Sequence, residues 1–253
     1  MAIKLYSLSL SHPAHSARLM LEHKGIEHEI VDLLPGFHPL LLHAAGFRGG
    51  TVPALRIDGR RIQGTLRISR ALDELRPDPP LFPSDPEQRR NVEEAEAWGE
   101  RDLQPIPRRF FRWAVTRDAE MREWIARDIV QMPAPRLMAT LNLPVARYLA
   151  RRSDAYDAVV RADLAELPAT LDRVDDLIER DIIGQARPNA ADFQIATSVR
   201  ILLSFPDLFP LIEGRPAEEL ARRTMPDYVG ERIPFAFPAE WIPAAPVLSR
   251  PGR

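Results

Sequence analysis

Residues 51–72 read TVPALRIDGRRIQGTLRISRAL, and this stretch decides the fold. The apolar residues that follow Pro53 predict a short strand, and Asp58-Gly59 is typical of a tight turn between two strands. Arg61–Gln63 predict the strand that returns, and Gly64-Thr65 predict the start of a helix. The stretch therefore predicts a β-hairpin that leads directly into a helix.

Two features of this stretch suit a ligand. A Val52–Pro53 peptide bond held cis would expose the backbone of Val52 as an edge on which an extended peptide can dock. Thr65 places a hydroxyl group at the start of a helix, where the positive end of the helix dipole favours a carboxylate. Both features lie within fifteen residues of each other.

The chain before this stretch alternates between strand and helix patterns. In chain order we expect a strand at 3–8, a helix at 14–24, a strand at 27–33 and a loop or short helix at 35–47. With the hairpin and the helix at 65–75, the order becomes βαβαββα. This order predicts a thioredoxin-like fold, which is a mixed sheet with helices on both faces.

A proline-rich run ends this first part of the chain. Five prolines occur in the eleven residues 76–86, so this run cannot form a helix or an inner strand and is interpreted as an interdomain linker. After it, apolar spacing predicts helices at 88–103, 121–131, 155–181 and 190–203, and Pro168 is expected to kink or break the third of these. The tail from Pro206 is rich in proline and aromatic residues, and we expect it to pack on the helices as a partly ordered extension. The predicted domains are residues 1–77, a linker at 78–86, a helical domain at 87–213 and an extension at 214–253.

Composition excludes several classes of protein. Hydrophobic residues make up 45 % of the 253 residues, which predicts a folded chain, and the net charge of −2 argues against a general nucleic-acid-binding protein. The sequence has no cysteine, which excludes disulfides, a thiolate nucleophile and zinc–thiolate sites. Only two of the 34 basic residues, Lys4 and Lys24, are lysines. No apolar run reaches about 18 residues and the N-terminus predicts a strand, so we expect a soluble cytoplasmic protein without a membrane segment.

Two stretches resemble glutathione S-transferases. Residues 51–72 resemble the second half of the thioredoxin-like domain of that family, whose usual form is VPAL, a turn, a strand, then Glu-Ser and a helix. Residues 182–193 contain a variant capping box, with Asn189 as the N-cap and Asp192 as the N3 acid, and the family carries a similar structural box in its C-terminal domain. The resemblance covers roughly residues 1–205. It implies an α/β thioredoxin-like domain followed by an all-α helical domain.

The same resemblance implies an activity and its central residue. Members of this family join glutathione, as a co-substrate, to a small apolar electrophile, and they are usually homodimers. Aligning Arg18 with the arginine of the family's first helix puts Ser11 at the activating position, and His12 could assist it. A thiol has a pKa of about 8.5, so a hydroxyl that donates a hydrogen bond to sulfur at a helix start stabilises the reactive thiolate. The alternatives are that Ser11 is only an N-cap and that Ser9 is the donor, whereas Tyr6 is expected in the core.

The resemblance also implies how the peptide would be held. Val52 and Pro53 would align its cysteinyl part, Thr65 would hold the γ-glutamyl carboxylate, and Arg48 could meet the glycyl carboxylate. Gly64 stands where the family has an acid that assists the ammonium group. This departure predicts a weaker affinity for glutathione or a different thiol.

The resemblance places the electrophile pocket between the two domains. Phe110 and Trp113 are candidates for its lining, together with Trp241 if the tail folds back, and the alternative is that these aromatic residues belong to the core or to a dimer contact. All six histidines fall within the first 43 residues, and we expect surface or loop histidines without a metal site. Two other functions stay open at this point: a transferase-fold protein that binds or scaffolds without catalysis, and a thiol-dependent isomerase or dehalogenase.

Overall fold

The computed structural model describes residues 2–244, which fall into two compact units. Unit 1 extends to Gln104 and also includes Arg180–Ser198. Unit 2 comprises Pro105–Glu179 and the described residues from Val199 onward. Each unit is described separately below.

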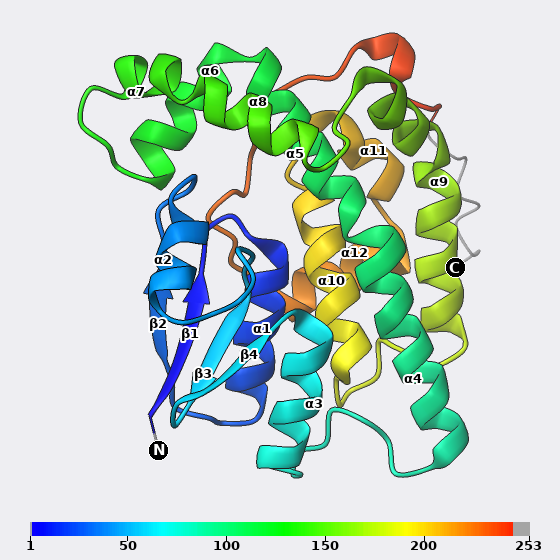
Figure 1. Cartoon of the computed structure of the whole chain (residues 1–253). Helices are drawn as coiled ribbons and strands as arrows, with labels where there is room; N and C mark the ends of the chain where they lie inside the picture. Colours follow the sequence, from blue (N-terminus) through cyan, green and yellow to red (C-terminus); the bar gives the residue numbers. More distant parts are fainter. Residues whose placement is uncertain (1, 245–253) are drawn as a thin grey trace. The chain divides into compact units, whose positions relative to one another are not determined.

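Unit 1 contains the sheet and the helices packed on it (Figure 1). Its elements are β1 (Ile3–Ser7), α1 (His12–His23), β2 (Glu29–Asp32), α2 (His38–Ala44), β3 (Ala54–Ile57), β4 (Arg60–Gln63), α3 (Thr65–Leu75), α4 (Pro86–Trp98), the π-helical turn η1 (Gly99–Leu103) and the first part of α10 (Ala190–Leu202). The predicted order βαβαββα is confirmed, and α3 has its predicted bounds.

The sheet is mixed, with the strand order β2-β1-β3-β4. Strand β1 pairs in parallel with β2 and antiparallel with β3, and β3 pairs antiparallel with β4. On one face Tyr6 and Ala54 pack with Leu42 of α2 and with Phe47. Side chains alternate along a strand, so the fully buried Leu5 points to the opposite face, where α1 and α3 pack against each other. Helices therefore cover both faces, as a thioredoxin-like fold requires.

The proline-rich run belongs to unit 1 and does not separate the two units. The buried ammonium group of Lys24 donates to Asp73 Oδ1 at 2.8 Å and to the carbonyl oxygens of Arg76 and Pro79 at 2.6 and 2.7 Å. These bonds tie the end of α1 to the end of α3 and to the start of the run. The predicted linker at 78–86 thus lies within unit 1, and the Lys24 side chain holds the start of the run against the ends of α1 and α3.

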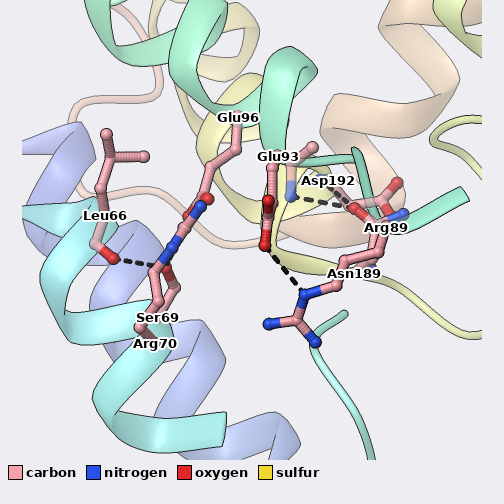
Figure 2. Close-up of polar contacts among 9 residues, drawn as sticks. Leu66, Ser69, Arg70, Arg89, Glu93, Glu96, Asn189 and Asp192 are labelled. Atoms are coloured by element: carbon pink, nitrogen blue, oxygen red, sulfur yellow. Dashed lines mark hydrogen bonds and ion pairs between the residues drawn. The ribbon is translucent and has the colours of Figure 1, made fainter. Parts of the chain in front are cut away.

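Helix α10 begins at the predicted capping box (Figure 2). Asn189 Oδ1 accepts hydrogen bonds from the backbone N–H groups of Ala191 at 2.9 Å and Asp192 at 3.3 Å. Asp192 Oδ2 accepts from the Asn189 N–H at 2.8 Å, and its Oδ1 accepts from the Gly184 N–H at 2.6 Å. The box is buried and fully paired, so the prediction of a structural cap is confirmed.

Unit 2 is built from helices. They are α5 (Pro105–Arg117), α6 (Ala119–Trp124), the π-helical turn η2 (Ile125–Ile129), α7 (Pro135–Leu141), α8 (Leu143–Arg151), α9 (Asp157–Glu179), the remainder of α10, η3 (Pro206–Leu208), α11 (Phe209–Ile212), α12 (Pro216–Thr224) and η4 (Ala239–Trp241). The tail that was expected to be an extension thus contains two further α-helices. The predicted extension continues into residues 245–253, which lie outside the described range.

Pro168 was expected to kink or break its helix, and the break does not occur, because α9 is continuous across it. An internal proline costs a helix about 3 kcal/mol through one lost hydrogen bond and a clash with the preceding turn. Four neighbours of Pro168 on this helix are fully buried: Leu164, Leu167, Leu171 and Val174. Burying a large aliphatic side chain contributes about 1.5–3 kcal/mol, so the packing of these four residues exceeds the penalty.

Candidate functional site

The strand register brings three loops of unit 1 to one end of the sheet. Tyr6, near the end of β1, lies opposite Ala54 at the start of β3, and Ala54 lies opposite Gln63 at the end of β4. The segment that follows β1, the segment that precedes β3 and the segment that follows β4 therefore meet at the same edge. These three segments carry Ser11, Val52 and the start of α3.

Ser11 occupies the N-cap position of α1, and its hydroxyl group does not cap the helix. Its backbone N–H donates to the Leu8 carbonyl at 2.8 Å, and its carbonyl accepts from Ala14 and His15. Within residues 2–244 the hydroxyl makes no hydrogen bond, and the side chain is partly exposed. The first turn of α1 carries no acidic residue, so its positive end is not neutralised locally. The hydroxyl is thus available to donate to a ligand.

The other candidate donors beside Ser11 are occupied. The Ser9 hydroxyl lies 2.5 Å from Asp32 Oδ2, which makes it a donor to a carboxylate inside the fold. His12 is buried, and its Nε2 lies 3.2 Å from the carbonyl oxygen of Gln104. His15 Nε2 lies 2.7 Å from the Ser9 carbonyl, and burial lowers the pKa of His15 below its ordinary value.

Val52 precedes a cis peptide bond to Pro53, as the sequence predicted. The carbonyl of Pro53 accepts a hydrogen bond from the Gly64 N–H at 3.1 Å, which joins the start of β3 to the start of α3. Among the described residues the backbone N–H and C=O groups of Val52 have no hydrogen-bond partner. An unpaired backbone unit beside a sheet is the group that an extended peptide can use.

Gln63 holds the loop that precedes Val52, a role that the sequence did not predict. Its side-chain amide accepts from the Gly49 N–H at 3.0 Å and donates to the carbonyls of Gly49 and Thr51 at 2.7 and 3.0 Å. Arg48 is exposed next to this clamped loop. The clamp role of Gln63 could hardly be predicted from the sequence, because a glutamine in a strand has no typical partner.

Helix α3 also begins without a side-chain cap. Its N-cap residue Gly64 has φ 91° and ψ 143°, a conformation that residues other than glycine rarely adopt. The first turn of α3 has no acidic residue. Thr65 follows and is only 1 % exposed, so its hydroxyl lies at the inner edge of the helix start.

A buried acid fixes this helix one turn further along (Figure 2). Ser69 donates to Glu96 Oε1 of α4 at 2.6 Å, and Arg70 pairs with the same carboxylate. Burial raises the pKa of Glu96 above its ordinary value, and the positive charge of Arg70 acts in the opposite direction. Glu96 could not be predicted from the sequence, because its partners lie 26 and 27 residues earlier in the chain.

Phe110 and Trp113 lie in the packed interior of unit 2, which agrees with the alternative that these aromatic residues belong to the core. Phe110 is fully buried and Trp113 is 5 % exposed. Phe237 covers both, with ring centroids 5.3 Å from Phe110 and 5.9 Å from Trp113, and the Trp113 indole stacks with it at an interplanar angle of 5°. Trp241 approaches Trp113 to 5.3 Å, so the tail folds back onto α5 as the sequence suggested.

Across residues 2–244, no group of three or more histidine, aspartate or glutamate side chains is placed to hold a metal ion. No single helix in that range has the length and apolar composition to cross a bilayer. One pair of segments meets this test together: Ala190–Leu202 and Pro206–Ile212, which are bent by 108° relative to each other.

Comparison with known proteins identifies the fold family. Residues 5–80 match the glutathione S-transferase N-terminal domain. A glutathione S-transferase from Rhodospirillum rubrum superimposes with a TM-score of 0.56 at 21 % identity, over 94 % of this chain and 97 % of that one. The Tau class glutathione S-transferase from mango (Mangifera indica) gives 0.59 at 16 % identity over 90 % of each chain. The β-etherase LigF from Sphingobium gives 0.53 at 22 % identity, over 80 % of this chain and 84 % of that one. The search of curated proteins produced no match. Residues 5–80 thus resemble the N-terminal domain of glutathione S-transferases, and the chain shares the fold of these structures, a thioredoxin-like domain followed by a helical region.

Proposed function

We propose that this protein binds glutathione or a related thiol peptide and conjugates it, through its sulfur atom, to a small apolar electrophile. The observation that carries the proposal is the free hydroxyl of Ser11 at the uncapped start of α1. It lies at the same end of the sheet as the unpaired backbone of Val52 and the open start of α3. The match of residues 5–80 to the glutathione S-transferase N-terminal domain supports the same proposal.

The proposed chemistry follows from the acidity of a thiol. A free thiol has a pKa of about 8.5 and is mostly protonated near pH 7, whereas its thiolate is the nucleophile. The Ser11 O–H would donate to the sulfur anion, and the N-terminus of α1 would add a positive potential. The thiolate then forms a sulfur–carbon bond with the electrophile. In a substitution the leaving group departs with the bonding electrons, and the thiol proton passes to water.

The proposed peptide contacts use backbone groups more than side chains. The N–H and C=O of Val52 would pair with the cysteinyl residue, beside Pro53. The γ-glutamyl carboxylate would accept from the backbone N–H groups at the start of α3 and from the Thr65 hydroxyl. Arg48 would approach the glycyl carboxylate. Gly64 offers no acid to the ammonium group, so we expect a dissociation constant in the millimolar range rather than the micromolar range.

A matched pair of serine variants tests this proposal. We expect Ser11→Ala to lower kcat/KM for conjugation of glutathione to an activated aryl chloride by about 100-fold, the usual effect of removing a hydrogen-bond donor to a developing anion. Ser84→Ala, at an exposed serine of the proline-rich run, is the control and should leave the rate unchanged. Calorimetry with glutathione accompanies the assay. A Ser11→Ala enzyme as active as the parent would contradict the role of Ser11, and no heat of binding at millimolar glutathione would remove the whole proposal.

A binding or scaffold function without catalysis is the second candidate, and Gly64 favours it. The missing acid removes a contact to the ammonium group, while the folded start of α3 stays intact. Heat of binding with no turnover against several electrophiles would support this candidate. Turnover of a haloalkane or of a double-bond isomer would instead indicate a thiol-dependent dehalogenase or isomerase, which the same thiolate site can support.

A homodimer is part of the proposal. Unit 1 exposes four large apolar side chains on α2 and the loop before it: Leu34, Phe37, Leu40 and Leu41, which are 40–70 % exposed. A patch of this kind marks an interaction surface in soluble proteins. Light scattering during size exclusion should report twice the chain mass of 28.7 kDa. Replacing Phe37 and Leu40 with serine should shift the equilibrium to monomer.

A further inference from the structure

Helices α7 and α8 of unit 2 turn large apolar side chains toward solvent (Figure 1). Four such side chains are 38–59 % exposed: Leu137 and Leu141 on α7, and Val145 and Tyr148 on α8. Helical hydrogen bonding continues between the two helices, because the Asn142 N–H donates to the Met138 carbonyl at 2.9 Å and the Asn142 carbonyl accepts from the Ala146 N–H at 2.9 Å. A spacing of four, four and three residues then keeps the four side chains on one side of the helical path. They are called the α7–α8 stripe below.

The opposite side of both helices is already packed, and it carries small residues. Ala139 of α7 and Ala150 of α8 are each 5 % exposed. Arg122 Nε of α6 donates to the Ala139 carbonyl at 3.1 Å, and Arg112 of α5 donates to the hydroxyl of Ser153, just after α8. A surface helix of a soluble protein normally turns its large apolar residues inward. Here the small residues face inward and the large ones face outward, which marks the stripe as an interaction surface.

The charged residues of this segment all have the same sign. Residues 129–153 contain both helices and include no aspartate or glutamate, although the whole chain has a net charge of −2. The segment has four arginines, all of them exposed: Arg136, Arg147, Arg151 and Arg152. Arg136 pairs with Glu123 of α6 at 3.3 Å. Arg147 and Arg151 are four residues apart, and Arg151 comes three residues after Tyr148, so this row of cations borders the stripe.

We propose that the α7–α8 stripe binds an anionic lipid surface. A helix with an apolar side bordered by arginines lies in the plane of the lipid–water interface, with its apolar residues in the acyl boundary and its cations at the phosphate groups. Tyr148 suits the headgroup level, because its ring is apolar and its hydroxyl is polar. The absence of carboxylates from residues 129–153 favours a uniformly anionic surface over a protein, whose interfaces have polar rims with paired hydrogen bonds. The stripe uses none of the groups proposed to hold the thiol peptide and none of the α2 patch proposed for the dimer.

Sedimentation of the full chain with lipid vesicles at low ionic strength tests the proposal. We expect binding to vesicles of phosphatidylcholine and phosphatidylglycerol in equal parts, and much weaker binding to phosphatidylcholine alone. Leu141→Ser/Tyr148→Ser should weaken binding to the mixed vesicles at least about tenfold, because it removes apolar surface from the stripe. The control Leu75→Ser/Val229→Ser replaces two exposed apolar residues outside the stripe and should change binding by less than about twofold.

A second pair of variants tests the contribution of charge. Arg147→Ser/Arg151→Ser should weaken binding to the mixed vesicles about tenfold. The control Arg90→Ser/Arg187→Ser removes the same charge from exposed positions of unit 1 and should change binding by less than about twofold. Added salt should weaken binding of the parent protein, because exposed charges are screened. Circular dichroism should give the same thermal midpoint for all four double variants, since every replaced side chain is exposed.

Two tryptophan reporters locate the contact directly. With mixed vesicles the emission of Val145→Trp should shift to shorter wavelength, whereas that of Val229→Trp, at an exposed valine outside the stripe, should not. The proposal is overturned if the parent protein does not bind the mixed vesicles, if it binds phosphatidylcholine alone equally well, if a control double variant loses as much binding as its test variant, or if Val145→Trp shows no shift. It is also overturned if the stripe variants keep vesicle binding and instead lower the mass found by light scattering, which would assign the stripe to a contact between copies of the chain.

Discussion

Helices of unit 1 begin in two opposite ways. Helix α4 begins at Asp85, whose carboxylate accepts from the N–H groups of Glu87 and Gln88 at 3.0 and 2.9 Å, and α10 begins at the Asn189 box. Helices α1 and α3 begin at Ser11 and Gly64 with no side-chain cap. Both open starts lie at the end of the sheet where β1 and β4 finish.

This difference indicates which helix starts of unit 1 can still accept an anionic ligand. Each helix start exposes backbone N–H groups that need an acceptor, and a side-chain cap contributes about 0.5–2 kcal/mol by supplying one. At α4 and α10 the chain supplies that acceptor itself. At α1 and α3 it does not, so an anionic ligand can supply it instead. The predictions below test this contrast in order of expected effect.

The largest effect is expected at the closed start of α10. Asp192→Ala removes the acceptors of the buried Asn189 N–H group and the partly buried Gly184 N–H group, and losing such a hydrogen bond costs about 1–3 kcal/mol. We expect a loss of about 3 kcal/mol in the free energy of unfolding, measured by urea denaturation. Asp192→Asn keeps one acceptor oxygen and should lose less. Equal losses for the two variants would contradict the role of these hydrogen bonds.

A smaller effect is expected at the start of α3. Gly64→Ala forces alanine into a backbone conformation that glycine alone adopts freely, at a cost of about 1–3 kcal/mol. A Cβ atom at this position meets nothing within 4 Å, so the cost is conformational and not steric. Urea denaturation measures it. An unchanged midpoint would mean that the start of α3 relaxes to admit a side chain, which would contradict the predicted conformational cost.

The contrast itself is tested by comparing Asp85→Ala with Ser11→Ala. We expect Asp85→Ala to cost about 1 kcal/mol, because two N–H groups lose their cap. Ser11→Ala should change stability by less than about 0.5 kcal/mol, because its hydroxyl makes no hydrogen bond within the described residues. If Ser11→Ala destabilises the fold as much as Asp85→Ala, the two kinds of helix start are not different.

The smallest effect on stability is expected at acidic pH. Burial lowers the pKa of His15 in the folded protein, so below the ordinary histidine pKa the unfolded chain binds more protons than the folded chain. Stability should therefore fall as the pH drops through that window. His15→Gln should flatten this part of the stability profile, measured by thermal unfolding from pH 7 to pH 5. A variant profile as steep as that of the parent would assign the loss to other groups.

Local patterns predicted the elements that depend on local chemistry. The hairpin turn at Asp58-Gly59 needs positive φ angles, and both residues adopt them. The capping box was predicted because its members lie three residues apart. The cis bond before Pro53 and the bounds of α3 also follow from short stretches of sequence.

Contacts between distant residues could not be predicted in the same way. The clamp of Gln63 on Gly49 and the bonds from Ser69 to Glu96 depend on strand register and helix packing, which no short pattern encodes. The aromatic tail was expected to pack on helices, but the sequence could not show that Phe237 fills the space beside Phe110. The break expected as one outcome at Pro168 does not occur, because its local penalty is outweighed by burial on both sides.

Because the chain has only two lysines and Lys24 is buried, Lys24 can serve as a chemical reporter of local opening. The side chain of Lys24 has no exposed surface, whereas that of Lys4 is 32 % exposed. An acylating reagent should thus modify Lys4 readily in the native protein and reach Lys24 only when the junction between α1, α3 and the proline-rich run opens. Mass spectrometry after a brief labelling pulse would then measure the fraction of Lys24 that is labelled, which reports how often this junction opens.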